Sequence, residues 1–276
     1  GLDQSFPKVF CYYLKPYKPI VSLIQMAAFD HRPFTFDEYG GKQFKPYRDF
    51  IDHSYISLSK GYFFHTIGKA ANSSVKSIFY DLELASTHWK QPSVHDRSSS
   101  PLLSPFQLDS DALQKVFGDS NYVRFVFVRN PFSRLLSCYL DRIYDQRSRP
   151  YRSLCGFCDK PIGYKFQFEE FIEIICDQTD FQQNNHWRLM YADSMFELIH
   201  YTFIGKQEYF ADDMNRLLKI LGQDSSRFNM ADRSNSPKAI QSDTLLGQFW
   251  RKKTIELVQD RYSKDFTYFG YDPDSI

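Results

Sequence analysis

The stretch FFHTIGKAANSSV (residues 63–75) has the composition of a phosphate-binding turn. A short aromatic run ends at Gly68 and Lys69, and small residues and two serines lead into a helical pattern. Unpaired N–H groups at the start of a helix carry partial positive charge and bind anions, and Gly68 is expected to permit the tight turn. We therefore predict an anion site that is formed by Lys69, Ala70, Ala71, Asn72, Ser73 and Ser74.

This turn differs from the GxxxxGK[ST] loop of P-loop kinases and NTPases. Phe63 stands where that pattern begins with Gly, and Ala70 follows Lys69 where the pattern has the Ser or Thr that binds magnesium. A P-loop kinase-like phosphotransferase is therefore the weaker alternative. Taken alone, the stretch also fits a structural strand–turn–helix connection with a surface lysine.

A second anion site is predicted in VRFVFVRNPFSRLLSCYL (residues 123–140). Its run of Val and aromatic residues is the clearest strand pattern in the chain, and Arg129 follows directly. Pro131 suits the first turn of a helix, and Ser137 lies about two helical turns beyond Arg129. Arginine and a helix hydroxyl together bind phosphate well, although a buried arginine that caps a sheet would give the same pattern. Two such sites at one sheet edge predict a ligand with two separated phosphate-like groups.

Together the two stretches resemble the cofactor motifs of sulfotransferases that use 3′-phosphoadenosine 5′-phosphosulfate (PAPS) and release 3′,5′-adenosine bisphosphate (PAP). They are most similar to the carbohydrate sulfotransferase group, which includes the chondroitin and HNK-1 enzymes and bacterial relatives. HTIGKAANSS resembles the motif that binds the 5′-phosphosulfate, with Gly68 in place of the usual Pro, and RNPFSRLLSCY resembles the motif that binds the 3′-phosphate. The resemblance implies that Lys69 stabilises charge on the leaving group and that Arg129 and Ser137 contact the 3′-phosphate.

The same resemblance implies a general base on the segment between the two motifs, where related enzymes use His or Glu. His95, in a polar loop, is the preferred candidate, and His88 and Glu83 are alternatives. His65, just before the turn, is interpreted as a strand residue. His186 in NNHWRLMY fits an HW element of the group and is interpreted as structural or acceptor-side.

Three more segments resemble the group. They are FIGKQEYFADDMNRLLKILG (203–222), KDFTYFGYD (264–272) and ADRSNSPKA (231–239). The last resembles a loop that closes over the cofactor, which would bring Asn235 and Ser236 to it, although a solvent-exposed loop fits equally well. A basic region could receive an anionic glycan or could simply be solvated; it consists of Arg142, Arg147, Arg149, Arg152, Lys160 and Lys165.

Strand patterns alternate with helical patterns, which predicts an α/β fold. With the resemblance, we expect a P-loop-NTPase-like parallel sheet flanked by helices, in a single sulfotransferase domain over residues 1–276. We expect an irregular N-terminal segment at 1–50, with a short helix near 20–28, and an acceptor-side loop at 147–165. Strands are expected within 55–66, 122–128 and 200–205, and helices at 73–83, 111–117 (with Ser110 as N-cap), 132–144, 166–177, 208–221 and 242–262.

The composition limits the remaining functions. The net charge is +1, which argues against nucleic acid as a partner, and no run reaches the roughly 18 apolar residues of a membrane span. Aromatic residues make up 18% of the chain, which predicts a Phe-rich core or exposed rings that stack on sugars. Cys155 and Cys158 form one CxxC without further ligands, so we predict no metal and a free or locally bridged pair in a loop.

The predicted reaction is therefore in-line transfer of a sulfuryl group from PAPS to a hydroxyl, with a carbohydrate as the preferred acceptor, without a metal. A non-catalytic glycan-binding module with a degenerate cofactor site is a further alternative. Animal members of the group are anchored in the Golgi. Asn72–Ser73–Ser74 is an N-glycosylation sequence inside the predicted phosphate loop, so we predict a cytoplasmic protein, with the Golgi lumen as the alternative if the chain is part of a longer one. The sequence leaves the oligomeric state open.

Overall fold

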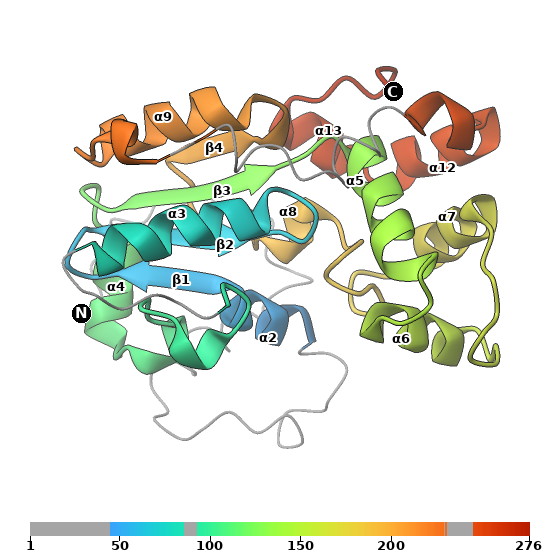
Figure 1. The fold of residues 1–276 in the computed structure, drawn as a ribbon, viewed down its shortest axis with the longest axis horizontal. Helices are drawn as coiled ribbons and strands as arrows, with labels where there is room; N and C mark the ends of the chain where they lie inside the picture. Colours follow the sequence, from blue (N-terminus) through green and yellow to red (C-terminus); the bar gives the residue numbers. More distant parts are fainter. Residues whose placement is uncertain (1–44, 86–92, 229, 231–244) are drawn as a thin grey trace, which may run out of the picture.

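The computed structural model describes residues 45–85, 93–228, 230 and 245–276, and its centre is a four-stranded sheet between helices (Figure 1). The strands lie in the order β1 (Ser54–Ser57), β2 (Tyr62–Thr66), β3 (Val123–Val128) and β4 (Phe203–Lys206). β2, β3 and β4 are parallel, as predicted, whereas β1 is antiparallel to β2. A fully parallel sheet was therefore wrong, because the short turn between β1 and β2 can join only antiparallel strands.

The helices confirm most of the predicted ranges. They are α2 (Lys45–Asp52), α3 (Asn72–Leu84), α4 (Ser110–Gly118), α5 (Pro131–Cys138), α6 (Arg149–Phe157), α7 (Phe168–Asp177), α8 (Met190–Asp193), α9 (Phe210–Ile220), α12 (Lys252–Arg261) and α13 (Ser263–Phe269). A π-helical turn, Tyr139–Ile143, continues α5. The predicted helix at 242–262 is interrupted at Trp250 before α12 begins. None of the helices in the described ranges is long and apolar enough to cross a membrane.

Two local predictions were wrong because of capping. The predicted loop at 147–165 contains α6, which Ser148 caps by accepting a hydrogen bond from the N–H of Tyr151 (3.0 Å). The N-cap of α4 is Asp109 rather than Ser110, since the Asp109 carboxylate accepts from the N–H of Ala112 (2.8 Å).

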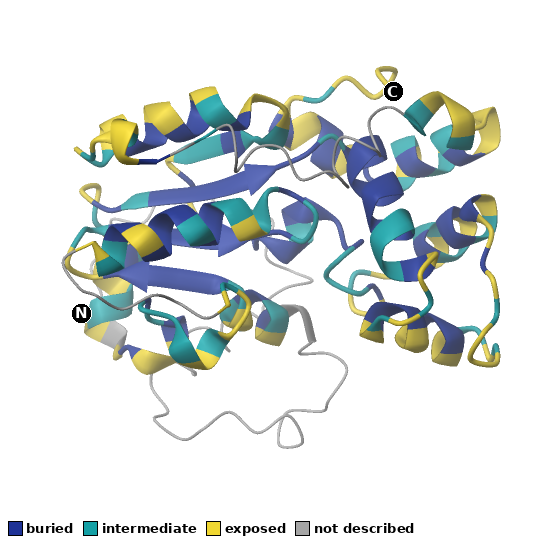
Figure 2. Cartoon of the chain, viewed as in Figure 1, coloured by how far each residue is buried: buried dark blue, intermediate teal, exposed yellow. Residues whose placement is uncertain are grey.

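Successive residues of the strands point to opposite faces of the sheet, and each face is covered by helices. Tyr62, Phe64 and Phe125 pack with residues of α3 and α9. Phe63 and Val126 pack with residues of α2, α4 and α8 on the other face. β1, β2 and β3 are accordingly buried almost throughout, β4 is only partly buried, and the outer sides of the helices are exposed (Figure 2). This aromatic core confirms the interpretation of the high Phe content.

A third cluster of apolar side chains lies beyond the carboxyl ends of the parallel strands. It joins α5, α6, α7 and α12, which gather at one end of the sheet in Figure 1. Trp187 and Trp250 lie within it, and Phe132 contacts Trp250 edge-to-face at 4.9 Å between ring centroids. The loops that follow β2 and β3 therefore run between the sheet and this helical cluster, which is where the predicted anion sites lie.

Candidate functional site

The loop between β2 and α3 has an unusual backbone conformation. Lys69 and Ala71 have φ values of 68° and 55°, in the left-handed region that non-glycine residues rarely occupy. Gly68 does not have a positive φ, so the predicted reason for this glycine was wrong. It permits a close approach of two backbone segments instead, because a Cβ on Gly68 would lie 3.2 Å from the Cα of His186. The loop is therefore shaped by its contact with the segment around His186.

The side chain of Lys69 is paired with a carboxylate of the same chain. Its Nζ donates to Oδ2 of Asp141 at 3.0 Å, and Nε of Arg142 forms an ion pair with the same oxygen at 3.2 Å. Asp141 lies in the π-helical turn after α5, and such turns are frequent at functional sites. Burial lowers the pKa of Lys69, and the Asp141 carboxylate opposes this shift. Lys69 is thus a charged group in a partly buried site, and its partner is one carboxylate. An incoming anion that displaces this carboxylate can bind there.

The start of α3 provides backbone donors without a side-chain cap. Ala70 is buried, and the N–H of Ala71 is occupied by Oε1 of Gln207 at 2.8 Å. Asn72 is the first residue of the helix, and its Oδ1 is buried without a partner among the described residues. Ser73 is exposed and Ser74 is half-buried. The predicted loop residues thus lie together, although Gln207 covers one of the donors.

The second predicted motif meets the first. Arg129 is buried at the end of β3, and its Nη1 lies 3.5 Å from the carbonyl oxygen of Lys69. Asn130 caps α5 by accepting from the N–H groups of Phe132 and Ser133. Ser137 is buried two turns along that helix. The structure therefore brings Lys69, Arg129 and the helix that carries Ser137 to the same edge of the sheet.

Arg134 joins the two motifs, a role that the sequence analysis did not anticipate. It is 1% exposed, and its guanidinium donates to three backbone carbonyl groups. The acceptors are Gly68 (2.9 Å), Arg188 (2.8 Å) and Asn185 (3.2 Å). One side chain of α5 thus holds both the first loop and the segment before α8. The spacing within the second motif was visible in the sequence, but the identity of these partners was not.

A buried charge network lies behind this segment and was also missed. Arg188 donates to Asp193 (2.9 Å) and to Asp49 (2.8 Å), and His65 donates to Asp193 at 3.5 Å. Burial would raise the pKa of Asp193, but the hydrogen bond from His65 and the charge of Arg188 lower it to about 2. His65 is a buried residue of β2, which confirms its interpretation as a strand residue. Asp49, His65 and the Arg188–Asp193 pair come from three distant parts of the chain, so no local pattern could reveal the whole network.

The predicted bases are not equally placed. His95 lies at the loop, where its Nε2 is 3.1 Å from Oγ of Ser73 and its Nδ1 is 3.3 Å from Nζ of Lys76. Glu83 is near the other end of α3 and accepts hydrogen bonds from Tyr62 (2.6 Å) and Lys60 (3.3 Å), so it is remote from the loop. His88, Asn235 and Ser236 lie outside the described residues.

The basic region lies on and around α6. Arg149 and Arg152 are exposed, while Arg147 forms an ion pair with Asp145 at 2.9 Å. Cys155 and Cys158 are free thiols, the former within α6 and the latter at its end, rather than a pair in a loop. The described part of the chain contains no group of three side chains that could hold a metal ion.

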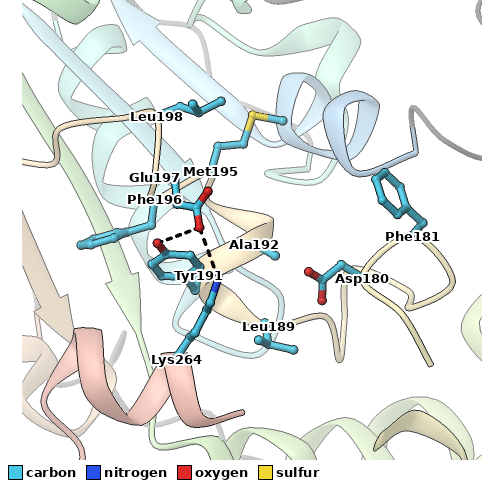
Figure 3. A pocket seen from close by; sticks show the side chains of 10 residues that line it. All are labelled: Asp180, Phe181, Leu189, Tyr191, Ala192, Met195, Phe196, Glu197, Leu198 and Lys264. Atoms are coloured by element: carbon cyan, nitrogen blue, oxygen red, sulfur yellow. Dashed lines mark hydrogen bonds and ion pairs between the residues drawn. The ribbon is translucent and has the colours of Figure 1, made fainter. Parts of the chain in front are cut away.

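A separate pocket lies between α8, α13 and the segments that precede and follow α8 (Figure 3). At its polar edge Glu197 accepts hydrogen bonds from Tyr191 (3.1 Å) and Lys264 (3.2 Å). The rest of its lining is mostly apolar and includes Met195 and Phe196. No residue of either predicted motif lines this pocket, so it is distinct from the anion site.

Comparison with known proteins decides the family. The sulfotransferase family profile matches residues 52–272, which include both motifs and all four strands. The chain belongs to the sulfotransferase family. The resemblance stated from the motifs is thereby confirmed. No solved structure matches the chain significantly, so the P-loop-NTPase-like character of the sheet stays a prediction.

The curated relatives are carbohydrate sulfotransferases. The chain is 30% identical to carbohydrate sulfotransferase 11 of Danio rerio over 167 residues, which are 55% of this chain and 47% of the relative. It is 32% identical to carbohydrate sulfotransferase 12 of Xenopus laevis over 178 residues, 56% of this chain and 41% of the relative. For carbohydrate sulfotransferase 14 of Homo sapiens the identity is 28% over 165 residues, 55% of this chain and 43% of the relative. The matches thus span less than half the length of these proteins.

Proposed function

We propose that this chain transfers a sulfuryl group from PAPS to a hydroxyl of a carbohydrate acceptor. The observation that carries the proposal is the meeting of two anion-binding motifs at one sheet edge, with Nη1 of Arg129 3.5 Å from the carbonyl of Lys69. Membership of the sulfotransferase family supports the reaction, and the names of the curated relatives support the carbohydrate acceptor.

The residues at this edge fit a ligand with two phosphate-like groups. Lys69 and the uncapped N–H groups of α3 would bind the 5′-phosphosulfate, and Arg129 and Ser137 would bind the 3′-phosphate. The bound donor would supply the sulfuryl group and the bisphosphate leaving group. Lys69 would stabilise the negative charge that develops on the leaving oxygen, which is the usual source of catalysis in such transfers.

The acceptor would reach this site from the side of the π-helical turn and α6. Arg142 lies beside Asp141 in that turn, and Arg149 and Arg152 are exposed on α6. Exposed arginines of this kind attract anionic ligands and bind carboxylate or sulfate groups bidentately. The region therefore favours an anionic glycan over a neutral one.

The compartment is proposed from the resemblance to these relatives. Enzymes of the carbohydrate sulfotransferase group act in the Golgi, so we favour the Golgi-lumen alternative; the cytoplasmic prediction has no support from the relatives. Asn72 lies in the first turn of α3 with its Oδ1 buried, and we therefore predict that the folded protein carries no glycan there. Intact-mass analysis after secretory expression, with and without a glycosidase, would measure this. A fully glycosylated and active protein would contradict it.

The decisive experiment is calorimetric titration with PAP, with ATP–magnesium in parallel. We expect PAP to bind, and to bind at least tenfold more weakly to Lys69→Ala and Arg129→Ala. Lys219→Ala and Arg227→Ala are matched controls, because both side chains are exposed and neither belongs to a motif or to the basic region. Urea unfolding of each variant separates loss of a contact from loss of the fold. Binding of ATP–magnesium alone would favour the kinase-like alternative, and binding of neither would favour the glycan-binding module.

A further inference from the structure

The general base can be sought among the histidines that the structure describes. A base needs a ring nitrogen whose lone pair is available to a hydroxyl. In His53 both ring nitrogens have a hydrogen-bond partner, namely the carbonyl of Asp49 (2.7 Å) and the Asn185 amide (3.4 Å). In His65 the two partners are Ser54 (3.2 Å) and Asp193 (3.5 Å). His200 is exposed and precedes β4, at the opposite end of the strand from the loop.

His95, the candidate preferred from the sequence, is engaged as well. The Lys76 ammonium is 3.3 Å from its Nδ1 and can only donate, so it occupies the ring's lone pair. Nε2 then carries the proton and donates to Oγ of Ser73 at 3.1 Å. In this arrangement His95 is a hydrogen-bond donor to the loop and has no lone pair to offer.

His186 has the opposite arrangement. Its Nδ1 is 2.7 Å from Oδ1 of Asn184, and its own backbone N–H donates to that same oxygen at 3.1 Å. Because a backbone N–H can only donate, the atom facing it must be the amide oxygen, which in turn can only accept from Nδ1. Nδ1 therefore carries the proton and Nε2 has the lone pair. No hydrogen bond to Nε2 exists within the residues that the structure describes.

His186 lies against the loop that carries Lys69. Its Cα lies 3.2 Å from the place of a Cβ on Gly68, directly before Lys69. Its pKa is lowered to about 3, chiefly by burial and further by the positive charges of Arg142, Lys69 and Arg134. The imidazole is therefore neutral at physiological pH. An anionic donor bound at Lys69 would offset these charges and make the ring more basic only when the donor is present.

We propose that His186 is the general base of sulfuryl transfer and that Asn184 holds it in the tautomer that presents Nε2 to the acceptor hydroxyl. In this step the hydroxyl proton passes to Nε2 while the acceptor oxygen forms its bond to sulfur. The sulfur–oxygen bond to the leaving phosphate breaks, and its electron pair stays on the phosphate oxygen beside Lys69. The inference rests on the proposed function, and it replaces His95 in this role.

The test compares turnover with binding in matched variants. The probe is PAPS with desulfated chondroitin as acceptor, and PAP affinity is measured by calorimetry. We expect His186→Ala to lower kcat at least 100-fold, in the range found for general bases, while the Kd for PAP changes less than threefold. His200→Ala is the control and keeps full activity. The proposal is overturned if His186→Ala keeps more than a fifth of kcat, or if His95→Ala causes the larger loss.

Asn184 is a positioning residue, and its variants separate that role from a structural one. Asn184→Asp keeps the hydrogen bond but adds a negative charge, which raises the pKa of the ring. We expect the acid limb of the kcat/KM profile to move to higher pH, whereas Asn184→Ala lowers kcat without this movement. An unchanged profile in Asn184→Asp would argue against the assignment.

A second measurement does not depend on the acceptor or on tolerance of the variants. Nitrogen-15 NMR of the histidine rings in the wild-type protein reports protonation and tautomer directly. We expect His186 to be neutral with the proton on Nδ1 at pH 7, and its pKa to rise when PAP is added. A proton on Nε2, or a charged ring at pH 7, would overturn the proposal. Failure of the wild-type protein to bind PAP would instead refute the proposed function.

Discussion

Replacement of Arg134 by lysine tests how far the two motifs depend on each other. Arginine presents several donors in a rigid fork, whereas lysine presents a single charged point. The guanidinium of Arg134 bonds the carbonyl groups of Gly68, Asn185 and Arg188 at 2.8–3.2 Å. The lysine in Arg134→Lys can keep one of these bonds, so two buried carbonyl groups lose their partner.

The size of the effect follows from those two lost bonds. Hydrogen bonds from charged groups contribute about 1.5–3 kcal/mol each, so Arg134→Lys should lower the free energy of unfolding by about 3–6 kcal/mol. The variant should also bind PAP more weakly, by tenfold or more, because the carbonyl of Gly68 directly precedes Lys69 in the loop.

Urea unfolding and calorimetry with PAP are the two assays. Arg227→Lys is the control, because Arg227 is exposed and lies outside both motifs. If Arg134→Lys is as stable as the wild-type protein, the three contacts do not stabilise the fold. If it loses stability but binds PAP normally, the link between Arg134 and the loop is wrong.

Three further outcomes are expected. The pKa of His186 is about 3 in the folded protein and 6.5 in the unfolded chain, so this residue costs the wild-type protein at most about 2 kcal/mol of stability as the pH falls to 5. In His186→Gln this loss of stability at acid pH should become smaller. Urea unfolding at pH 7.5 and pH 5 measures the difference. Gly68→Ala should weaken PAP binding several-fold, since its Cβ would crowd His186; calorimetry showing unchanged affinity would contradict this. Gly205→Ala should lower the unfolding free energy by about 1–3 kcal/mol, because its Cβ would lie 2.4 Å from the Phe127 ring; an unchanged urea midpoint would refute that clash.

The sequence predicted those features of the fold that depend on local pattern. The buried run of β3 and the Asn130–Pro131 start of α5 could be recognised because a strand period and a cap are written in neighbouring residues. The antiparallel direction of β1 was not predicted, because it depends on the length of one turn. The helix α6 was not predicted, because it depends on one serine cap.

The site was predictable to the same extent. Lys69 and Arg129 could be paired because both follow parallel strands, whose carboxyl ends share one edge of the sheet. The partners that hold them could not be predicted, since Asp141 and Gln207 reach the loop only through tertiary packing. The hydrogen bonds of His95 could not be predicted either, because Lys76 faces its ring only after α3 has formed. Local sequence thus indicates which groups are present, but not which lone pairs remain available.

The ion pair of Lys69 with Asp141 makes ligand binding an exchange reaction. In the proposed site the Asp141 carboxylate lies where the phosphosulfate would bind, so an incoming ligand would have to displace a carboxylate that is tethered 3.0 Å from the ammonium. A tethered competitor acts at a high local concentration that does not vary with the solution. Weak monovalent anions such as chloride would therefore be excluded at physiological levels, whereas a ligand held at both ends of the site can displace the carboxylate. The ion pair would thus favour anions that bind at both ends of the site over anions that bind at Lys69 alone.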